Sequence, residues 1–393
     1  MQPLSGRRIW FVGIGGAGLS AYAQLARAWG AEVGGWDRVE TPYLRALRDL
    51  EVRVSPEPEA PSGWEVVVST AYAGRIEGRP REELLAELVS LRRAIVVAGA
   101  HGKTTTTAMI AFVLDRLGLD PAFLVGGEIP QLGGNAGTGE GWLVVEGDES
   151  DRSVAALWPE IAVLLNVDLD HHTTFGSRVE VEELFEQWLA HVPQVVRAEE
   201  LEPVTLQLAV AGEHNRRNAA AALAALALAG VPPSDAERAI VEFRGVGRRL
   251  EAKGERGGVQ VVDDYAHHPA EIAATIAAVR ERGAGRVLVL FQPHLYSRTA
   301  HLAHEFAHAL ASADAVCVVD VYPAREEPLP GVTGKLIVDE LSRVRPGMRV
   351  GWAPEVEDGA RLLVSWSRPG DILVTLGAGD VDRAAAVLLG AAA

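Results

Sequence analysis

The chain has 393 residues, which is too long for one ordinary hydrophobic core and predicts two or three domains. A formal net charge of -16 argues against a protein that wraps nucleic acid or coats an anionic membrane, and it favours a small-molecule partner. Cys317 is the single cysteine, so no disulfide or cysteine-zinc framework is available, and no signal peptide or membrane-spanning run is predicted, which indicates a cytoplasmic enzyme.

The first segment predicts a βαβ unit with a glycine-rich turn. A strand is expected at 8–13, a helix at 19–29 and a second strand at 32–36, which ends at Asp37. Glycines at 13, 15, 16 and 18 allow close backbone approach to a diphosphate, and Asp37 would lie near a ribose. Because these glycines depart from the G-x-G-x-x-G spacing, the ligand could be NAD or another nucleotide diphosphate, and a purely structural turn also stays open.

A further strand is expected at 66–71 and ends in the hydroxyls of Ser69 and Thr70. The ends of such strands face the ligand crevice in open α/β sheets. We therefore expect these hydroxyls to face a ligand of the first unit.

The stretch from 94 to 109 carries the strongest functional signal. A short apolar strand enters a turn bounded by Gly99 and Gly102, and Lys103 and Thr104 follow where a helix is expected to begin. Backbone N–H groups and a helix N-terminus converge there, which favours an anion. Lys103 would add a cation for a terminal phosphate, and the Thr104 hydroxyl is of the type that holds Mg²⁺. Although the two glycines are three residues apart rather than five, the pattern predicts a nucleotide-phosphate loop.

Acidic side chains follow two strands downstream of this loop. Glu146 ends the strand at 143–146 and Asp148 follows it, while Asp168 and His171 follow the strand at 161–165. Because the carboxyl ends of parallel strands meet at one edge of a sheet, both groups would lie beside the phosphate loop. Oxygen ligands with one imidazole, next to bound phosphates, suit Mg²⁺ or Mn²⁺ better than zinc.

The remaining sequence predicts helices and a third α/β unit. Asn215 and Asn218 share one face at the start of an alanine-rich helix, where they could read a base edge or cap the helix. Ser234 is expected to cap the next helix, and Arg248 and Arg249 place two cations at a hinge. Further strands are expected at 259–264, 286–292, 315–319 and 371–376.

Nine motifs that span all three predicted units give the chain a family resemblance. The chain resembles the ATP-dependent Mur ligases of peptidoglycan synthesis, and its motifs occur in the same order as in that family. The motifs are GIGGAGLSAYA at 13–23, GAHGKTTTT at 99–107, EGDESD at 146–151, NVDLDH at 166–171, GEHNRRN at 212–218, FRGVGRRLE at 243–251, DDYAHHP at 263–269, FQPHLYSRT at 291–299 and LGAGD at 376–380.

The resemblance implies an α/β enzyme with the three-domain Mur ligase architecture. A Rossmann-like N-terminal domain at 1–93 would bind a UDP-sugar, a P-loop central domain at 94–247 would bind ATP, and a Rossmann-like C-terminal domain at 248–393 would close over ATP and the amino acid. The implied activity joins L-alanine to the lactyl carboxylate of UDP-N-acetylmuramate through an acyl phosphate, with ATP and Mg²⁺, or Mn²⁺, as cofactors.

The resemblance also implies which residues carry the reaction. The UDP-sugar would contact Gly15, Gly16, Ala17, Gly18, Asp37, Ser69, Thr70 and Asn135. ATP would contact Gly99, His101, Gly102, Lys103, Thr104, Thr105, His214, Asn218, Arg249 and Asp264, while the metal would be held by Thr104, Glu146 and His171. His267 and Arg298 would place the alanine, and the residues expected to act in catalysis are Lys103, Glu146, His171, Arg249, His267 and Arg298.

Departures from the family pattern leave alternatives open. About forty residues separate His171 from Gly212, where the family has a longer segment, so a small accessory sheet is expected to be reduced or lost. His172 makes the identity of the ligand histidine ambiguous, and Leu295 stands where some members have an arginine. A ligase that attaches a recycled peptide to the same UDP-sugar, a non-catalytic UDP-sugar and ATP sensor, and an NAD-dependent dehydrogenase are the competing hypotheses.

Overall fold

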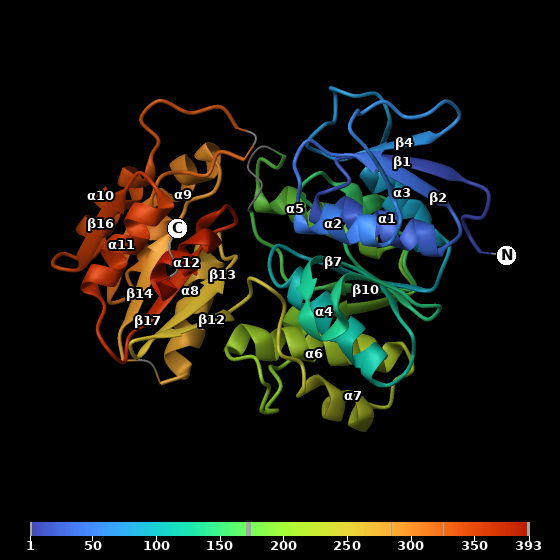
Figure 1. The fold of residues 1–393 in the computed structure, drawn as a ribbon. Coiled ribbons are helices and arrows are strands. Elements are labelled where there is room, and N and C mark those ends of the chain that lie inside the picture. The colour runs from blue at the N-terminus through green and yellow to red at the C-terminus, as the bar shows by residue number, and fades with distance from the viewer. Residues whose placement is uncertain (1, 170–173, 284, 325, 391–393) are drawn as a thin grey trace. The chain divides into compact units, whose positions relative to one another are not determined.

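The computed structural model describes residues 2–169, 174–283, 285–324 and 326–390, and it divides into two compact units (Figure 1). The first unit comprises residues 1–208 and 217–244, and the second comprises residues 209–216 and 245–393. No helix among the described residues has the length and apolar character needed to cross a bilayer.

The first unit contains two sheets, of which the N-terminal one is entirely parallel, in the order β3-β2-β1-β4-β5. Four consecutive residues of its central strand are buried, as expected for a parallel strand covered on both faces. Its strands are β1 (Arg8–Val12), β2 (Glu32–Trp36), β3 (Arg53–Ser55), β4 (Glu65–Val68) and β5 (Arg79–Pro80). Its helices are α1 (Ala17–Ala28), α2 (Pro42–Asp49) and α3 (Arg81–Ser90).

The second sheet of this unit has the order β11-β10-β6-β9-β7-β8, and only the β7–β8 pair is antiparallel. Its strands are β6 (Ala94–Ala98), β7 (Ala122–Ile129), β8 (Gly134–Thr138), β9 (Leu143–Glu146), β10 (Ile161–Leu164) and β11 (Gln194–Arg197). The helices are α4 (Lys103–Arg116), α5 (Arg178–Leu189), α6 (Glu213–Leu228) and α7 (Pro233–Ile240), with short 3-10 turns η1 (Pro130–Leu132), η2 (Ser153–Ala156) and η3 (Ala198–Glu200). Helix α1 of the first sheet packs against β7 and β8, which joins the two sheets into one unit.

The second unit contains one sheet, in the order β12-β13-β17-β14-β15-β16, with only the β12–β13 pair antiparallel. Its strands are β12 (Glu251–Arg256), β13 (Val259–Asp264), β14 (Val287–Phe291), β15 (Ala315–Val319), β16 (Arg349–Ala353) and β17 (Ile372–Leu376). Its helices are α8 (Pro269–Glu281), α9 (Tyr296–Leu310), α10 (Gly334–Val344), α11 (Val356–Trp366) and α12 (Ala384–Leu389), with a 3-10 turn η4 (Val381–Arg383).

Two local predictions need correction. Helix α7 begins one residue earlier than Ser234, because Pro233 occupies its first turn and Pro232 is the N-cap, and it ends at Ile240. The strand expected at 66–71 stops at Val68, so Ser69 and Thr70 lie in the turn that follows β4. In contrast, the strand at 315–319 was predicted with its observed bounds.

Candidate active site

The loop between β6 and α4 depends on two glycines. Gly99 has a φ of +132°, and a Cβ there would lie 2.9 Å from the carbonyl oxygen of Asn166. Gly102 is the N-cap of α4 with a φ of +86°, and a Cβ there would lie 2.5 Å from Oδ1 of Asn218. Both positions therefore exclude larger residues. The turn leads directly onto the N-terminus of a 14-residue helix, whose first N–H groups and dipole favour an anion.

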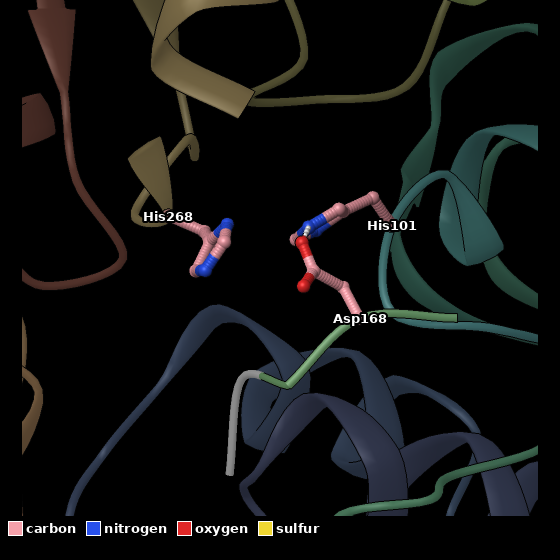
Figure 2. A group of neighbouring side chains, drawn as sticks. All are labelled: His101, Asp168 and His268. Atoms are coloured by element: carbon pink, nitrogen blue, oxygen red, sulfur yellow. Dashed lines mark ion pairs between the residues drawn. The ribbon is translucent and has the colours of Figure 1, made fainter. Parts of the chain in front are cut away.

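Asn166, which follows β10, fixes the tip of this loop. The backbone N–H of His101 donates to Oδ1 of Asn166 at 2.9 Å, and Nδ2 of Asn166 donates to the carbonyl oxygen of His101 at 2.9 Å. Nε2 of His101 lies 3.7 Å from Oδ2 of Asp168, and Figure 2 shows this ion pair. Figure 2 also labels His268, a residue of the second unit. The predicted metal ligand His171 lies outside the described residues.

Lys103 is held inside the loop by a buried carboxylate. Its Nζ donates to the carbonyl oxygen of Gly99 at 2.6 Å and to Oε2 of Glu149 at 2.9 Å. Glu149 is only 2% exposed. Burial by itself lowers the pKa of Lys103, but the negative charges of Glu149 and Asp148 outweigh burial and raise this pKa above its ordinary value. Lys103 is therefore a charged ammonium at the helix N-terminus.

Thr104 and Glu146 lie together, as expected from the neighbouring positions of β6 and β9. The Thr104 hydroxyl donates to Oε2 of Glu146 at 3.0 Å, and the N–H of Gly126 donates to Oε1 of Glu146 at 2.6 Å. Thr105 follows in the first turn of α4 and is buried. The hydroxyl and carboxylate oxygens form the hard donor set that Mg²⁺ prefers.

The glycine turn of the N-terminal sheet is anchored by neighbouring strand ends. Gly13 has a φ of +88°, and a Cβ there would lie 2.4 Å from Oγ of Ser69. The N–H of Gly15 donates to Oδ2 of Asp37 at 2.8 Å. Asp37 therefore holds the glycine turn itself, while Ser69, with Thr70 next to it, lies beside the start of that turn.

Residues from the second sheet reach the same glycine turn. Nδ2 of Asn135 donates to the carbonyl oxygen of Ala17 at 2.6 Å, so the structure brings Asn135 next to residues 15–18. Sequence reasoning missed Arg81, whose Nη1 lies 3.3 Å from where a Cβ of Gly18 would be. Arg81 also lies 3.6 Å from Asp148, the residue that follows Gly147 in the acidic cluster after β9. Arg81 is the first residue of α3, directly after Pro80, and no motif in the sequence indicated that it lies beside the glycine turn.

In the second unit, Asp264 stands at the end of β13 and is nearly fully buried. Its Oδ2 accepts a hydrogen bond from the N–H of Leu250 at 2.7 Å, and its Oδ1 accepts one from the N–H of Ala266 at 2.8 Å. Burial raises the pKa of Asp264 to about 6, although the positive charge of Arg249 and these two hydrogen bonds act in the opposite direction. The carboxyl group therefore holds the backbone at Leu250, the residue after Arg249, in place.

The two adjacent arginines have different surroundings. Arg248 has a φ of +58° and turns inward, where its Nε donates to Oδ2 of Asp263 at 3.0 Å. Arg249 lies over the ring of Tyr265 at 5.1 Å and has its Nη1 3.8 Å from Oε1 of Glu271. Arg248 is therefore tied to β13 and Arg249 lies beside α8, although the two side chains are about equally exposed, at 23% and 26%.

His214 is the other predicted nucleotide contact in this unit, and it lies at the start of α6. Burial lowers its pKa, and the charges of Arg249 and Arg216 lower it further, whereas Glu281 acts in the opposite direction. The ring is consequently neutral at neutral pH. Asn218 lies one turn further along α6 and belongs to the first unit.

The two residues expected to place the alanine, His267 and Arg298, lie on either side of His294, which was not predicted. Nη1 of Arg298 is 3.5 Å from Nδ1 of His294, and the rings of His294 and His267 are 6.0 Å apart. Arg298 is only 5% exposed. Leu295, just before α9, has a φ of +71°, an uncommon conformation for a leucine. The cluster places one cation and two imidazoles at the carboxyl end of β14.

These features define a class. The protein is an α/β enzyme of three mainly parallel sheets, in which a phosphate-binding loop before a helix is flanked by acidic strand ends. The family follows from comparison with known proteins.

The chain belongs to the Mur ligase family. Residues 8–93 match the model of the Mur ligase family catalytic domain, residues 97–197 match that of the Mur ligase middle domain, and residues 248–379 match that of the Mur ligase glutamate ligase domain. Each of the three sheets falls largely in one of these regions, which confirms the predicted three-domain architecture.

Relatives match along nearly the whole chain. The UDP-N-acetylmuramate--L-alanine ligase of Streptomyces coelicolor is 40% identical, with 96% of each chain covered, and that of Rubrobacter xylanophilus is 39% identical, with 97% of this chain and 99% of the relative covered. The crystal structure of the UDP-N-acetylmuramate-alanine ligase from Thermotoga maritima matches with a TM-score of 0.80 and 26% identity, covering 97% of this chain and 98% of that one. A murein peptide ligase from Psychrobacter arcticus shares the fold, with a TM-score of 0.68 and 23% identity.

Proposed function

We propose that this chain is a cytoplasmic ATP-dependent ligase that joins L-alanine to the lactyl carboxylate of UDP-N-acetylmuramate, a step of peptidoglycan precursor synthesis. The observation that supports this most strongly is the charged Lys103 at the phosphate loop, with Thr104 hydrogen-bonded to Glu146 beside it. Relatives that carry the name of this activity match the chain over nearly its full length.

The chemistry follows from the poor reactivity of a carboxylate toward an amine. A carboxylate oxygen attacks the γ-phosphorus of ATP, the bond from that phosphorus to the bridging oxygen breaks, and ADP leaves. The resulting acyl phosphate is attacked at its acyl carbon by the neutral amine of alanine. Inorganic phosphate then leaves, an amide bond has formed, and the amine has lost a proton.

The proposed role of Lys103 and Arg249 is to offset the repulsion between two anions. A carboxylate that approaches a triphosphate needs positive charge, and phosphoryl transfer is accelerated mainly by positioning and by electrostatic stabilisation. Lys103 acts from the N-terminus of α4, where the helix dipole adds to its charge. In the second unit we assign Arg249 to the γ-phosphate, Asp264 to the ribose, and His214, together with Asn218 of the first unit, to the adenine.

Thr104 and Glu146 fit a magnesium ion, because their contacting atoms are all oxygens beside the phosphate loop. Bound there, Mg²⁺ or Mn²⁺ would neutralise charge on the phosphates. His171 is proposed as a further ligand from the family pattern alone. The Thr104 hydroxyl donates to the Glu146 carboxylate, and this contact keeps both side chains at the same place.

The sugar nucleotide is assigned to the glycine turn at 15–18 with Ser69, Thr70 and Asn135. Family membership favours this ligand over NAD, since the match over residues 8–93 is to the Mur ligase family. His267 and Arg298 are assigned to the alanine. Nδ1 of His267 lies 3.0 Å from the carbonyl oxygen of Tyr265, so in the tautomer that donates this hydrogen bond Nε2 is the basic nitrogen, and His267 is our candidate for accepting the amine proton.

Phosphate release tests the proposal. The full chain is given UDP-N-acetylmuramate, ATP and Mg²⁺ with L-alanine, L-serine, glycine or an L-alanyl tripeptide, and a reaction without an acceptor is the blank. We expect phosphate release with L-alanine and formation of the amide product by mass spectrometry. Release with the tripeptide alone would replace the proposal by the peptide-recycling reaction, and no release with any acceptor would favour a sensor.

A further inference from the structure

Two exposed histidines lie one helical turn apart on α9, away from the residues assigned to the ligase reaction. His304 and His308 occupy positions i and i+4, which share one face of a helix. Their Nε2 atoms are 3.1 Å apart, and the ring planes meet at 72° with centroids 4.5 Å apart. The two imidazoles therefore direct the same ring nitrogen toward one point.

A carboxylate from the neighbouring helix contacts the far side of one of these rings. Oε2 of Glu340, on α10, lies 3.4 Å from Nδ1 of His304, and α10 packs directly against α9. Glu340 also pairs with Arg343 of its own helix, so its carboxylate is held in place. When Nδ1–H of His304 donates to Glu340, the lone pair of His304 is on Nε2, the nitrogen that approaches His308.

This is the arrangement in which proteins present histidine to transition metals. A ligating histidine donates its other ring N–H to a carboxylate, which fixes the tautomer and the ring orientation. Two histidine nitrogens that bind one tetrahedral ion at about 2.0–2.1 Å are about 3.3 Å from each other. The observed separation of 3.1 Å needs little adjustment to admit an ion.

We infer that His304 and His308 form a surface site for a borderline transition-metal ion such as Zn²⁺ or Ni²⁺, with Glu340 as the residue that orients His304. Water completes the coordination. Imidazole donors suit these ions, whereas the oxygen donors Thr104 and Glu146 suit Mg²⁺, so the two sites differ in the ion they select. The inference does not depend on the proposed ligase activity.

Titration calorimetry tests this site on the full, metal-stripped chain. NiCl₂ is titrated in the presence of excess MgCl₂, which occupies oxygen-lined sites. We expect one nickel site in the wild type, at least tenfold weaker binding in His304→Ala and in His308→Ala, and about 10–100-fold weaker binding in Glu340→Gln. His191→Ala is the matched control, because it removes another exposed histidine from the first unit and should bind nickel like the wild type.

A spectroscopic measurement on the wild type avoids dependence on variants. Electron paramagnetic resonance with one equivalent of Cu²⁺ should show hyperfine coupling to two imidazole nitrogens. Absence of nickel uptake by the wild type, nickel binding by both histidine variants as tight as that of the wild type, or a copper spectrum without nitrogen coupling would each overturn the inference and leave a simple imidazole–imidazole hydrogen bond. Because the His304 side chain is 63% exposed, its replacement should not impair folding.

Discussion

Replacement of Lys103 by methionine should separate the structural role of this lysine from its proposed catalytic role. The ammonium is the cation that faces Glu149, a carboxylate 2.9 Å away and only 2% exposed. Lys103→Met leaves that carboxylate buried without this charge. Loss of one partner of a buried pair costs about 3–5 kcal/mol, and we expect the lower end because the Lys103 side chain retains 18% exposure.

Thermal unfolding converts this cost into a measurable shift. For a unit of this size, each kcal/mol lowers Tm by about 2–4 °C, so Lys103→Met should lower the Tm of the first unit by about 6–12 °C. Lys103→Met/Glu149→Gln removes both charges and should regain most of the loss. Lys253→Met is the control, because Lys253 is paired with Glu251 on a partly exposed edge strand and should change Tm little.

Catalysis should respond differently from stability. Removal of one preorganised charge at a transferring phosphoryl group costs about 10²–10³ in kcat, and restoring stability in the double variant should not restore turnover. Binding of UDP-N-acetylmuramate, measured by calorimetry, should stay near the wild-type value in both. A Lys103→Met protein that melts within 2 °C (about 0.5–1 kcal/mol) of the wild type, or a double variant as unstable as the single one, would refute the buried-pair reasoning.

Three further predictions follow from individual contacts. Gly102→Ala should lower Tm and raise the ATP KM at least tenfold, because the new Cβ would lie 2.5 Å from Oδ1 of Asn218. Gly118→Ala is the control: Gly118 has a φ of +71° and no atom near the position of a Cβ, so the change should cost only about 1–2 kcal/mol of backbone strain and leave the ATP KM unchanged. Burial raises the pKa of Asp264 to about 6, above about 3.9 in the unfolded chain. The contribution of Asp264 to stability is therefore complete below about pH 4 and is lost as the pH rises through 6. Asp264→Asn should gain Tm relative to the wild type between about pH 4 and 7, and a Tm difference that stays constant over this range would contradict the reasoning. Arg298→Ala should raise the alanine KM while leaving the ATP KM unchanged, and an unaltered alanine KM would place the carboxylate contact elsewhere.

Local sequence patterns were sufficient for the phosphate loop and the strands that flank it. Apolar runs predicted β6, β9 and β10, and the glycine turn placed Lys103 at the start of α4, as observed. These signals depend on residues that are close in sequence. The edge strands β3, β5, β12 and β16 were not predicted, because they are short or partly exposed and lack a continuous apolar run.

Three contacts between residues that are distant in sequence were not predicted. Glu149 is part of the EGDESD motif and had no role assigned from the sequence, yet it is the carboxylate that holds Lys103 across 46 positions. Asn166 fixes His101 across 65 positions through two hydrogen bonds, and it was quoted only within a motif. No sequence pattern predicted the contacts of Arg81. Each contact exists only once the strands are ordered in the sheet, an arrangement that the local pattern does not specify.

The segment after β11 lies in the region that we expect to be shorter than in the rest of the family. The alignment with the Streptomyces coelicolor relative extends over 449 positions, which exceeds the 393 residues of this chain by 56, so at least that many aligned positions have no residue here. Residues 201–211 are described throughout, form no helix or strand, and include no buried side chain. This segment follows the edge strand β11, whereas the loop and the acidic residues lie at β6, β9 and β10.

An insertion tests whether this segment is energetically independent of the site. Eight glycine and serine residues placed between Pro203 and Val204 nearly double the length of the irregular segment 201–211. Each doubling of loop length costs only about 0.6 kcal/mol of loop-closure entropy. We therefore expect the Tm of the first unit to fall by no more than about 2 °C. The same insertion after Ala100 should abolish turnover and lower Tm strongly, because the N–H groups of Ala100 and His101, on either side of it, both donate to Asn166. If both insertions lower Tm equally, the segment after β11 supports the sheet and is not a tolerated loop.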